Sequence, residues 1–567
     1  MPSKVAQILP LNLTSPGING LNTTTSMAGD VGDWLFEATN SVFTKERNIA
    51  PREQFFEPST SYVTPIAENT TYAGFAGTDY FVYGNGKIYV KSGTDLSTFG
   101  NNGNAVPAWA SVFYWKVVHL NGKYFFFHDG VAPLVYAPYA GPPLFSGIPT
   151  GPTVGVAHSA FGRVWAASIS PSAPTLYWSL LLDGETWTGA GTGSLNLHTY
   201  LNADERVTCI HDFNNHLIVF TQSSILIFEN PFDVPVDSSG AGGTAGSLRL
   251  KEKIEGAGCL SVVGAVSVGE ECFFISQTGL MKMSQVVADG GSNPVKTAIN
   301  QVRTGITNEI SEFDFGTYYA PLNYLELSFD ADQGFLMLNI LYTKQFLIWL
   351  NHPIENGGYA VTTWETEQTN TDVGVIWTKI CSYYRTGGTS ATGAGATAWL
   401  QVYDSTATSI DYQGIATYGQ AQYTYPDDSP CETNGFLWTV KSPWLNFGDQ
   451  QDFQTKILKR LLVVHRRPRA KFDSGLGYTP TNLTVDFKIR TDYNDATYNF
   501  TFTGSYQEYN PNILVLPSYQ TQTVPLAGAG SLIQYELSAI VSDPGHMYFA
   551  LQRLSFQAKL GRIQQGI

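Results

Sequence analysis

GKYFFFHDG, residues 122–130, begins at a glycine, runs through aromatic side chains and ends in Asp129-Gly130. Asp-Gly favours a tight β-hairpin turn because both residues tolerate a positive φ. Similar strand-like segments recur along the chain, at residues 86–90, 162–167, 216–220, 271–275 and 334–340. Successive segments lie roughly 36 to 63 residues apart, near or above the roughly 40 to 50 residues of a four-stranded propeller blade. The repeat therefore predicts a β-propeller-like array whose sheets stack around a centre.

The composition supports an all-β fold. Aromatic residues make up 13% of the chain and charged residues only 14%, whereas amphipathic helices need many charged residues on their outer faces. Tyr and Phe favour pleated, half-buried surfaces, and 55 Gly with 29 Pro supply turns for many short strands. A chain of 567 residues is expected to hold more than one core, because single cores stop growing at about 250 to 300 residues.

Three regions of the sequence differ in periodicity and composition. Residues 1–60 show little periodicity and predict an extended N-terminal arm that packs on the platform domain or on a neighbouring subunit. Residues 61–430 carry the propeller-like repeats, with glycine-rich loops at 238–247 and 386–398. Residues 431–567 contain longer alternating segments, which predict a β-sandwich-like C-terminal platform domain.

The five cysteines form an odd set with no close pair in the sequence, which fits neither a disulfide framework nor a zinc site. We expect them to be buried small hydrophobes in a reducing compartment. The N-terminus lacks the apolar core of a signal peptide, and no stretch approaches the roughly 18 apolar residues of a membrane span. Synthesis in a cytoplasm, with no membrane span, is the expectation.

The formal net charge of -15 argues against a protein that binds nucleic acid tightly, because affinity for the phosphate backbone comes from clustered Lys and Arg. An acidic surface is compatible with a channel through which DNA passes without binding, because like charges repel. Solubility alone also explains such a charge.

The segment SLLLDGETW, residues 179–187, loosely resembles the Asp box of sialidase-type propellers, although the usual residue between Asp183 and Gly184 is missing. An Asp box is a structural turn and not a catalytic group. Glycosidase chemistry needs two carboxylates that face one substrate, and sequence spacing does not place such a pair in a propeller. We therefore expect a structural turn here and assign no catalytic residue.

Two further patterns resemble ligand sites. GAGGTA, residues 240–245, matches a dinucleotide fingerprint, but residues 248–254 alternate like a strand, so no helix N-terminus is expected to bind a pyrophosphate. His211 and His216 flank Asp212, but their spacing puts the two imidazoles on opposite faces of an uninterrupted strand. A shared metal ion is therefore not expected, and no cofactor is assigned.

A basic cluster stands out in this acidic chain and is a candidate for partner docking. Its members are Lys456, Lys459, Arg460, Arg466, Arg467, Arg469 and Lys471, with His465 among them. Such a cluster can dock an acidic subunit or contact DNA phosphates. The alternative is a solvated strand followed by a turn at Pro468.

Several segments, in this order, resemble the tail nozzle proteins of short-tailed bacteriophages, a family that includes tail tubular protein B and packaged-DNA stabilisation proteins. They are LNL (11–13), APR (50–52), GRVWAA (162–167), LYWS (176–179) with Asp183-Gly184 and Trp187, residues 215–228, KIEGAGC (253–259), FFIS (273–276) with Gly279-Leu280, residues 336–349 and 444–448. The resemblance covers most of the chain, and the ordered set carries it.

The resemblance implies a structural virion protein and not an enzyme. It implies a homo-hexameric ring below a tail adaptor ring, near tail fibres or spikes, assembled in the bacterial host cytoplasm. Double-stranded DNA would be retained by the tube and would later pass through its lumen without sequence-specific binding. A heterologous contact repeated about an axis closes into such a ring, and an acidic lumen would repel the duplex.

Two other classes of function remain open from the sequence. A propeller glycosidase would hydrolyse a polysaccharide, and carboxylate substitutions would abolish that activity. A monomeric interaction scaffold would bind peptides on its propeller face.

Overall fold

The computed structural model is almost entirely β, as the composition predicts. It describes residues 8–23, 33–52, 55–57, 70–76, 79–84, 87–91, 116–137, 145–170, 172–232, 248–289, 306, 325–330, 334–340, 344–354, 358–365, 374–383, 396–404, 413–418, 429–430, 436–446, 455–468, 470–473, 477–480, 482–492, 495–503, 519–542 and 549–560. Helix α1 (Met283–Asp289) packs on the sheet that precedes it. Within these residues, no helix has the length and apolar character that a membrane crossing requires.

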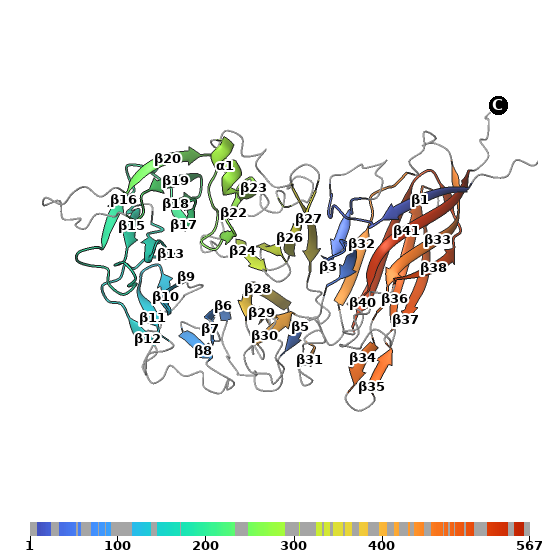
Figure 1. Ribbon diagram of the computed structural model, residues 1–567, viewed down its shortest axis with the longest axis horizontal. Coiled ribbons are helices and arrows are strands. Elements are labelled where there is room, and N and C mark those ends of the chain that lie inside the picture. Colours follow the sequence, from blue (N-terminus) through green and yellow to red (C-terminus); the bar gives the residue numbers. More distant parts are fainter. Residues whose placement is uncertain are drawn as a thin grey trace, which may run out of the picture.

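Successive antiparallel sheets lie around a common centre in a β-propeller-like arrangement (Figure 1). In chain order their strands are β6 (Thr70–Ala76), β7 (Asp79–Gly84) and β8 (Lys87–Lys91); β9 (Lys116–Leu120), β10 (Lys123–His128), β11 (Val131–Tyr136) and β12 (Phe145–Gly147); β13 (Val156–Ala160), β14 (Arg163–Ala167), β15 (Thr175–Trp178) and β16 (Gly193–Asn196); β17 (Val207–Phe213), β18 (His216–Thr221), β19 (Ser224–Glu229) and β20 (Arg249–Glu255); β21 (Ala265–Val268), β22 (Glu271–Ser276) and β23 (Gly279–Lys282); β24 (Leu325–Asp330), β25 (Phe335–Ile340), β26 (Lys344–Pro353) and β27 (Tyr359–Trp364); and β28 (Gly374–Tyr383), β29 (Ala396–Asp404) and β30 (Gln413–Tyr418).

The segments that revealed the repeat are mostly the second strands of these sheets. A two-residue turn precedes several of them, with a positive φ at both residues: Asn121-Gly122 before β10, Phe161-Gly162 before β14 and Asn214-Asn215 before β18. Such turns match the right-handed twist of the strands that they join. The Asp129-Gly130 turn between β10 and β11 also lies where the sequence predicts it.

The first strand of each sheet lies innermost. Contacts run from β9 to β13, from β13 to β17, from β17 to β22, from β21 to β24, from β24 to β28 and from β28 to β6. Each sheet then meanders away from the centre, as in β9-β10-β11-β12. Side chains of the first strands therefore meet near one axis.

Neighbouring sheets bury apolar side chains between them. One core joins the sheet of β9–β12 to that of β13–β16 and includes Phe127 and Val164. The next, with Trp165 and Val219, joins β13–β16 to β17–β20. A third core, with Phe220, packs β17–β20 on the sheet of β21–β23. The sheets of β13–β16 and β17–β20 are thus covered on both faces, and a single blade would not be stable alone because it cannot bury its faces by itself.

The propeller-like part and the C-terminal part share one continuous sheet. Its strand order is β24-β25-β26-β27-β2-β32-β40-β36-β37, where β2 (Glu37–Thr39) pairs with β27 on one side and β32 on the other. The platform strands are β32 (Phe436–Lys441), β36 (Asn482–Thr491), β37 (Asp495–Thr503) and β40 (Ile533–Val541). A short strand of the N-terminal arm thus bridges the two parts.

Other arm strands pair elsewhere. β1 (Ile8–Thr14) and β4 (Ile49–Pro51) pair with β41 (Ala550–Leu560), and β3 (Ser41–Phe43) pairs with β4. β5 (Phe55–Glu57) pairs with β30 and with β31 (Ser429–Pro430). The domain limits at residues 60 and 430 stay predictions from the sequence, and strand pairing crosses both of them.

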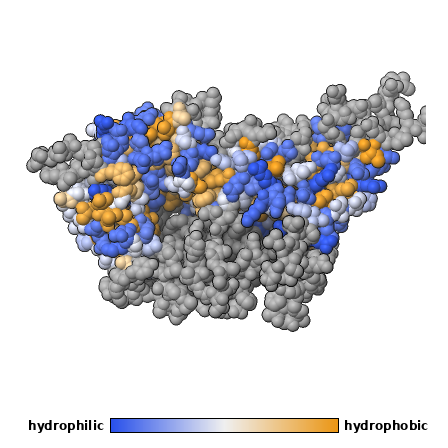
Figure 2. All heavy atoms as spheres, in the orientation of Figure 1, coloured by the Kyte–Doolittle hydropathy of each residue, from blue (hydrophilic) through white to orange (hydrophobic). Residues whose placement is uncertain are grey.

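The C-terminal part is a sandwich of two sheets. β33 (Lys456–Arg466) lies between β41 and β38 (Tyr519–Pro525), with β39 (Ala529–Gly530) beside it, while β34 (Ala470–Asp473) and β35 (Gly477–Pro480) form a separate hairpin. Alternate side chains of the two sheets share one core, in which the Tyr535 and Phe556 rings stack at 6.1 Å. Polar and apolar side chains are interspersed over the described surface in view (Figure 2).

Candidate functional site

Polar and titratable side chains gather where the innermost strands of the propeller-like part meet. They come from different sheets: Lys116 from β9, His158 from β13, His211 and Asp212 from β17, Ser267 from β21 and Glu326 from β24. The Lys116 ammonium donates a hydrogen bond at 3.1 Å to the carbonyl of Val262, which lies in the segment between β20 and β21. Lys116 therefore reaches across the centre.

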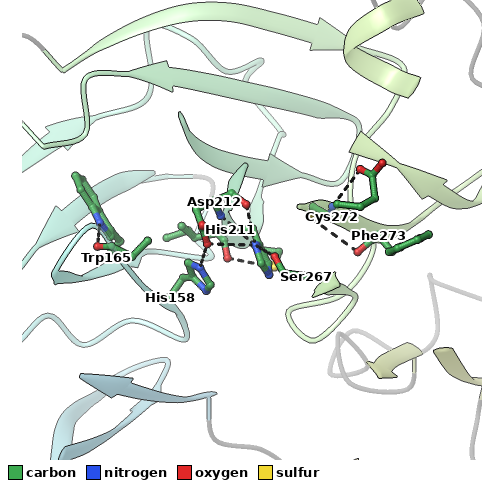
Figure 3. A network of polar contacts seen from close by, with 11 residues as sticks. His158, Trp165, His211, Asp212, Ser267, Cys272 and Phe273 are labelled. Atoms are coloured by element: carbon green, nitrogen blue, oxygen red, sulfur yellow. Dashed lines mark hydrogen bonds and ion pairs between the residues drawn. The ribbon is translucent and has the colours of Figure 1, made fainter. Parts of the chain in front are cut away.

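The core of this cluster is a histidine–aspartate–histidine group (Figure 3). His158 Nε2 lies 2.7 Å from Asp212 Oδ1, and His211 Nδ1 lies 3.6 Å from the same oxygen. The two imidazole rings face each other at 4.4 Å between centroids. These three side chains offer ligand atoms that all lie within 4.8 Å of one another, a geometry that can hold a metal ion.

The backbone of β17 sets how this group is built. Residues 211 and 212 point to opposite faces of the strand, as alternation requires. Asp212 turns toward β13 and meets His158, while His211 turns toward β21, where Ser267 Oγ lies 3.3 Å from His211 Nδ1. Because β17 is the edge strand at the centre, side chains from both of its faces reach the same polar site.

Burial controls the charges at the centre. Burial lowers the pKa of His158, and it lowers that of His211 to about 3, helped by the neighbouring His158. The hydrogen bond from His158 lowers the pKa of Asp212. Burial raises the pKa of Glu326 well above its ordinary value, against the opposing effect of Lys116. At neutral pH both imidazoles are uncharged and Asp212 is ionised.

His158 was not predicted as a site residue, and His211 was considered only together with His216. His216 starts β18 across the Asn214-Asn215 turn, where it lies 2.7 Å from the Asn214 carbonyl oxygen and 3.0 Å from Lys251 Nζ. Across the hairpin, His211 lies opposite Ile218, whereas His216 lies opposite Phe213. One signal was available: residues four positions before the turn residues Gly162 and Asn215 are His158 and His211, so these histidines occupy equivalent positions in successive repeats.

Three cysteines that are distant in the sequence lie near one another beside the centre. Cys209, Cys259 and Cys272 are buried, carry free thiols and belong to one apolar core. Burial raises the pKa of Cys259 and of Cys272. They behave as the predicted small hydrophobes.

The predicted basic cluster divides into buried and exposed residues. Lys456 is buried, and its ammonium donates to the Ser531 carbonyl, so Lys456 cannot join an exposed docking surface on this subunit. Lys459 and Arg460 are exposed on β33, whereas Arg466 and Arg467 are half-buried. Arg469 and the Lys471 side chain lie outside the described residues. Strand alternation and a bulge between Leu458 and Arg460 explain this division.

The segment that resembles an Asp box forms a structural turn, as predicted. Asp183 accepts hydrogen bonds from the Glu185 amide at 2.9 Å and from the Thr186 hydroxyl at 2.7 Å. The Trp187 indole donates to the Gly184 carbonyl at 2.8 Å. The glycine-rich residues 240–245 lie outside the described residues, and the segment after them forms strand β20.

Replacing Asp183 by alanine is expected to lower the free energy of unfolding by about 1 to 2 kcal/mol, because two hydrogen bonds to an ionised acceptor are lost. Thermal unfolding of the purified variant would measure this loss. Asp204→Ala is the matched control, since Asp204 is exposed in a nearby turn. Equal melting temperatures for the two variants would contradict the structural role of Asp183.

No protein-family model and no curated protein matches the chain. Among solved structures, the CNH domain of AfRom2 is similar at 7% identity and a TM-score of 0.33, over 64% of this chain and 98% of that one. The N-terminal domain of Nup170 in the Chaetomium thermophilum Nup170–Nup53 complex matches at 8% identity and a TM-score of 0.35, over 65% and 62%. The β-propeller domain of Cps50 (Swd1) from Myceliophteria thermophila matches at 11% identity and a TM-score of 0.31, over 64% and 100%. At these scores the similarities support no inference about function.

Proposed function

We propose that this protein is a structural virion protein, a subunit of the hexameric tail nozzle that closes the DNA exit channel of a short-tailed phage. In this role it retains packaged DNA and conducts it on ejection. The ring would sit on a tail adaptor ring and near tail fibres or spikes, after assembly in the bacterial host cytoplasm. The ordered sequence segments that resemble the nozzle family motivate the proposal.

The structural observation that carries the proposal is the sheet that runs without interruption from β24 to β37. Interfaces between domains normally permit relative motion, because few contacts cross them. Here backbone hydrogen bonds through β2 join the propeller-like part to the sandwich. A wall that must resist the pressure of packaged DNA needs such a connection, whereas an enzyme that closes on its substrate does not.

The surface also offers features suited to subunit contacts. An apolar patch, defined here as Phe161, Leu181, Leu182 and Phe232, lies in turns of the β13–β16 sheet and in the segment that follows β19. Both leucines and Phe232 are exposed, and the Phe161 and Phe232 rings meet edge to face at 4.8 Å. Exposed apolar clusters commonly mark protein–protein contacts. The net charge of -15 would weaken DNA adhesion in a lumen.

Assembly state tests the proposal. Native mass spectrometry and negative-stain class averages of the purified chain, with and without a co-expressed adaptor protein, are expected to show rings of six 62.0 kDa subunits with an open channel. A ring that forms only on the adaptor also supports the nozzle role. A chain that stays monomeric with the adaptor present would refute it and favour a monomeric scaffold. Polysaccharide hydrolysis that is lost on carboxylate substitution would instead favour a glycosidase.

A further inference from the structure

We propose that His158, His211 and Asp212 bind one divalent transition-metal ion of the Zn²⁺ or Co²⁺ class at the centre of the propeller-like part. The site joins β13 to β17 and is independent of the proposed role in a phage tail. It would act as a cross-link between the first strands of two successive sheets.

The donor set selects the class of metal. Two imidazole nitrogens and one carboxylate oxygen are ligands that Zn²⁺ and related first-row ions accept, with bonds of about 2.0 to 2.2 Å. Mg²⁺ and Ca²⁺ prefer a shell made of oxygen atoms. A site with two histidines therefore discriminates against both of these abundant cations.

The distances are close to those of a ligated ion. Two ligands bonded at about 2.0 Å to a tetrahedral ion lie about 3.3 Å apart. The separations from Asp212 Oδ1 to His158 Nε2 and to His211 Nδ1 are 2.7 and 3.6 Å, which bracket that value. Small side-chain rotations would equalise them, since the Asp212 side chain is half-exposed and its Oδ1 lies near a nitrogen of each ring.

The surroundings supply a further ligand and one opposing charge. Ser267 Oγ lies 3.3 Å from His211 Nδ1, so this hydroxyl or a water molecule can complete the coordination. Ser267 belongs to β21, which would tie a third innermost strand to the ion. The positive charge of Lys116 on β9 lowers the pKa of both histidines and therefore disfavours a bound cation. The affinity should therefore respond to the charge at residue 116.

Metal titration of tag-free protein, stripped with a chelator, tests the site. Co²⁺ is expected to bind at one equivalent and to give visible absorption of a four- or five-coordinate ion, and Zn²⁺ should displace it. Saturating Zn²⁺ should raise the melting temperature, because an ion that binds only the folded state stabilises it. His158→Gln and Asp212→Asn should each weaken Co²⁺ binding by more than about tenfold.

The control is His216→Gln, which changes a half-buried histidine of the same hairpin and should leave Co²⁺ binding unaltered. Lys116→Met should tighten binding several-fold, a change that a purely structural role for the histidines would not produce. Circular dichroism would identify the variants that fold. If His158→Gln does not fold, Asp212→Asn still tests the site, because asparagine has nearly the same shape as aspartate. Absent Co²⁺ absorption in the wild-type protein, or equal binding by His158→Gln and His216→Gln, would overturn the proposal.

Discussion

Replacing Arg52 by leucine is expected to lower the free energy of unfolding by about 3 to 5 kcal/mol, because it removes a hydrogen bond from a charged group, worth about 1.5 to 3 kcal/mol, and a desolvated cation–π contact, worth about 2 kcal/mol. Arg52 is only 1% exposed. Its guanidinium lies 3.8 Å from the centroid of the Phe436 ring and 5.8 Å from that of Trp364. These rings belong to the platform strand β32 and to the propeller strand β27, so one side chain of the arm contacts both parts.

Asn40 increases the cost of this substitution. Its side-chain oxygen accepts hydrogen bonds from Arg52 Nε at 3.0 Å and from the Glu365 amide at 3.1 Å, and its amide nitrogen donates to the Leu437 carbonyl at 2.7 Å. Asn40 also has a φ of 53°, a left-handed conformation that asparagine tolerates better than most residues. Loss of Arg52 removes a donor from the residue that joins arm, propeller and platform.

Urea denaturation followed by circular dichroism would measure the effect of Arg52→Leu. Lys45→Met is the matched control, because Lys45 lies on the same arm but is exposed. Arg52→Lys keeps the charge without the planar guanidinium and should recover only part of the loss. A denaturation midpoint for Arg52→Leu equal to that of Lys45→Met would show that the junction does not depend on Arg52.

The repeat was predictable because its information is local. The pair Asn121-Gly122 adopts positive φ values at both residues, which few other residues tolerate, and the aromatic strand β10 follows it directly. In the Asp129-Gly130 turn that ends this strand, Gly130 has the positive φ. The alternation in residues 456–464 and 483–490 likewise predicts β33 and β36. Each of these signals fits within about ten residues.

The bridge between the two parts was not predictable from such signals. Thr39 of β2 pairs with Thr363 and with Thr439, so both partners lie more than 300 residues away. A three-residue strand has no usable periodicity, and the choice of its partners depends on how the whole chain packs. The His158 cluster was missed for a related reason, since Asp212 and His158 meet only when two innermost strands become neighbours.

Replacing Glu205 by glutamine is expected to lower the free energy of unfolding by about 3 kcal/mol, because hydrogen bonds to a charged group contribute about 1.5 to 3 kcal/mol each. Glu205 is buried, and its carboxylate accepts hydrogen bonds from Thr221 at 2.5 Å, from Ser223 at 2.9 Å and from Ser224. The Asn202 amide donates to it at 3.1 Å. An amide offers one acceptor oxygen in place of two, so some of these donors would lose their partner.

The same carboxylate should make stability depend on pH. Burial alone would raise the pKa of Glu205, but the hydrogen bonds from Ser224 and Thr221 outweigh burial and lower the pKa below its ordinary value of 4.5. The unfolded chain therefore takes up a proton first as the pH falls. The stabilisation is complete above the unfolded pKa and is lost progressively as the pH falls through the folded pKa.

Urea denaturation midpoints at neutral pH and at a series of acidic pH values would test both expectations for Glu205. The wild-type protein should lose stability more steeply than Glu205→Gln below about pH 4.5, because the variant lacks the titrating group.

Glu255→Gln is the matched control. Glu255 lies in the same sheet and pairs with Lys253 at 3.0 Å, but its side chain is 71% exposed. Since solvent already hydrates that carboxylate, its loss should change stability by less than about 1 kcal/mol. Parallel acid profiles for the wild-type protein and Glu205→Gln would mean that the hydroxyl donors do not hold the carboxylate in its ionised form.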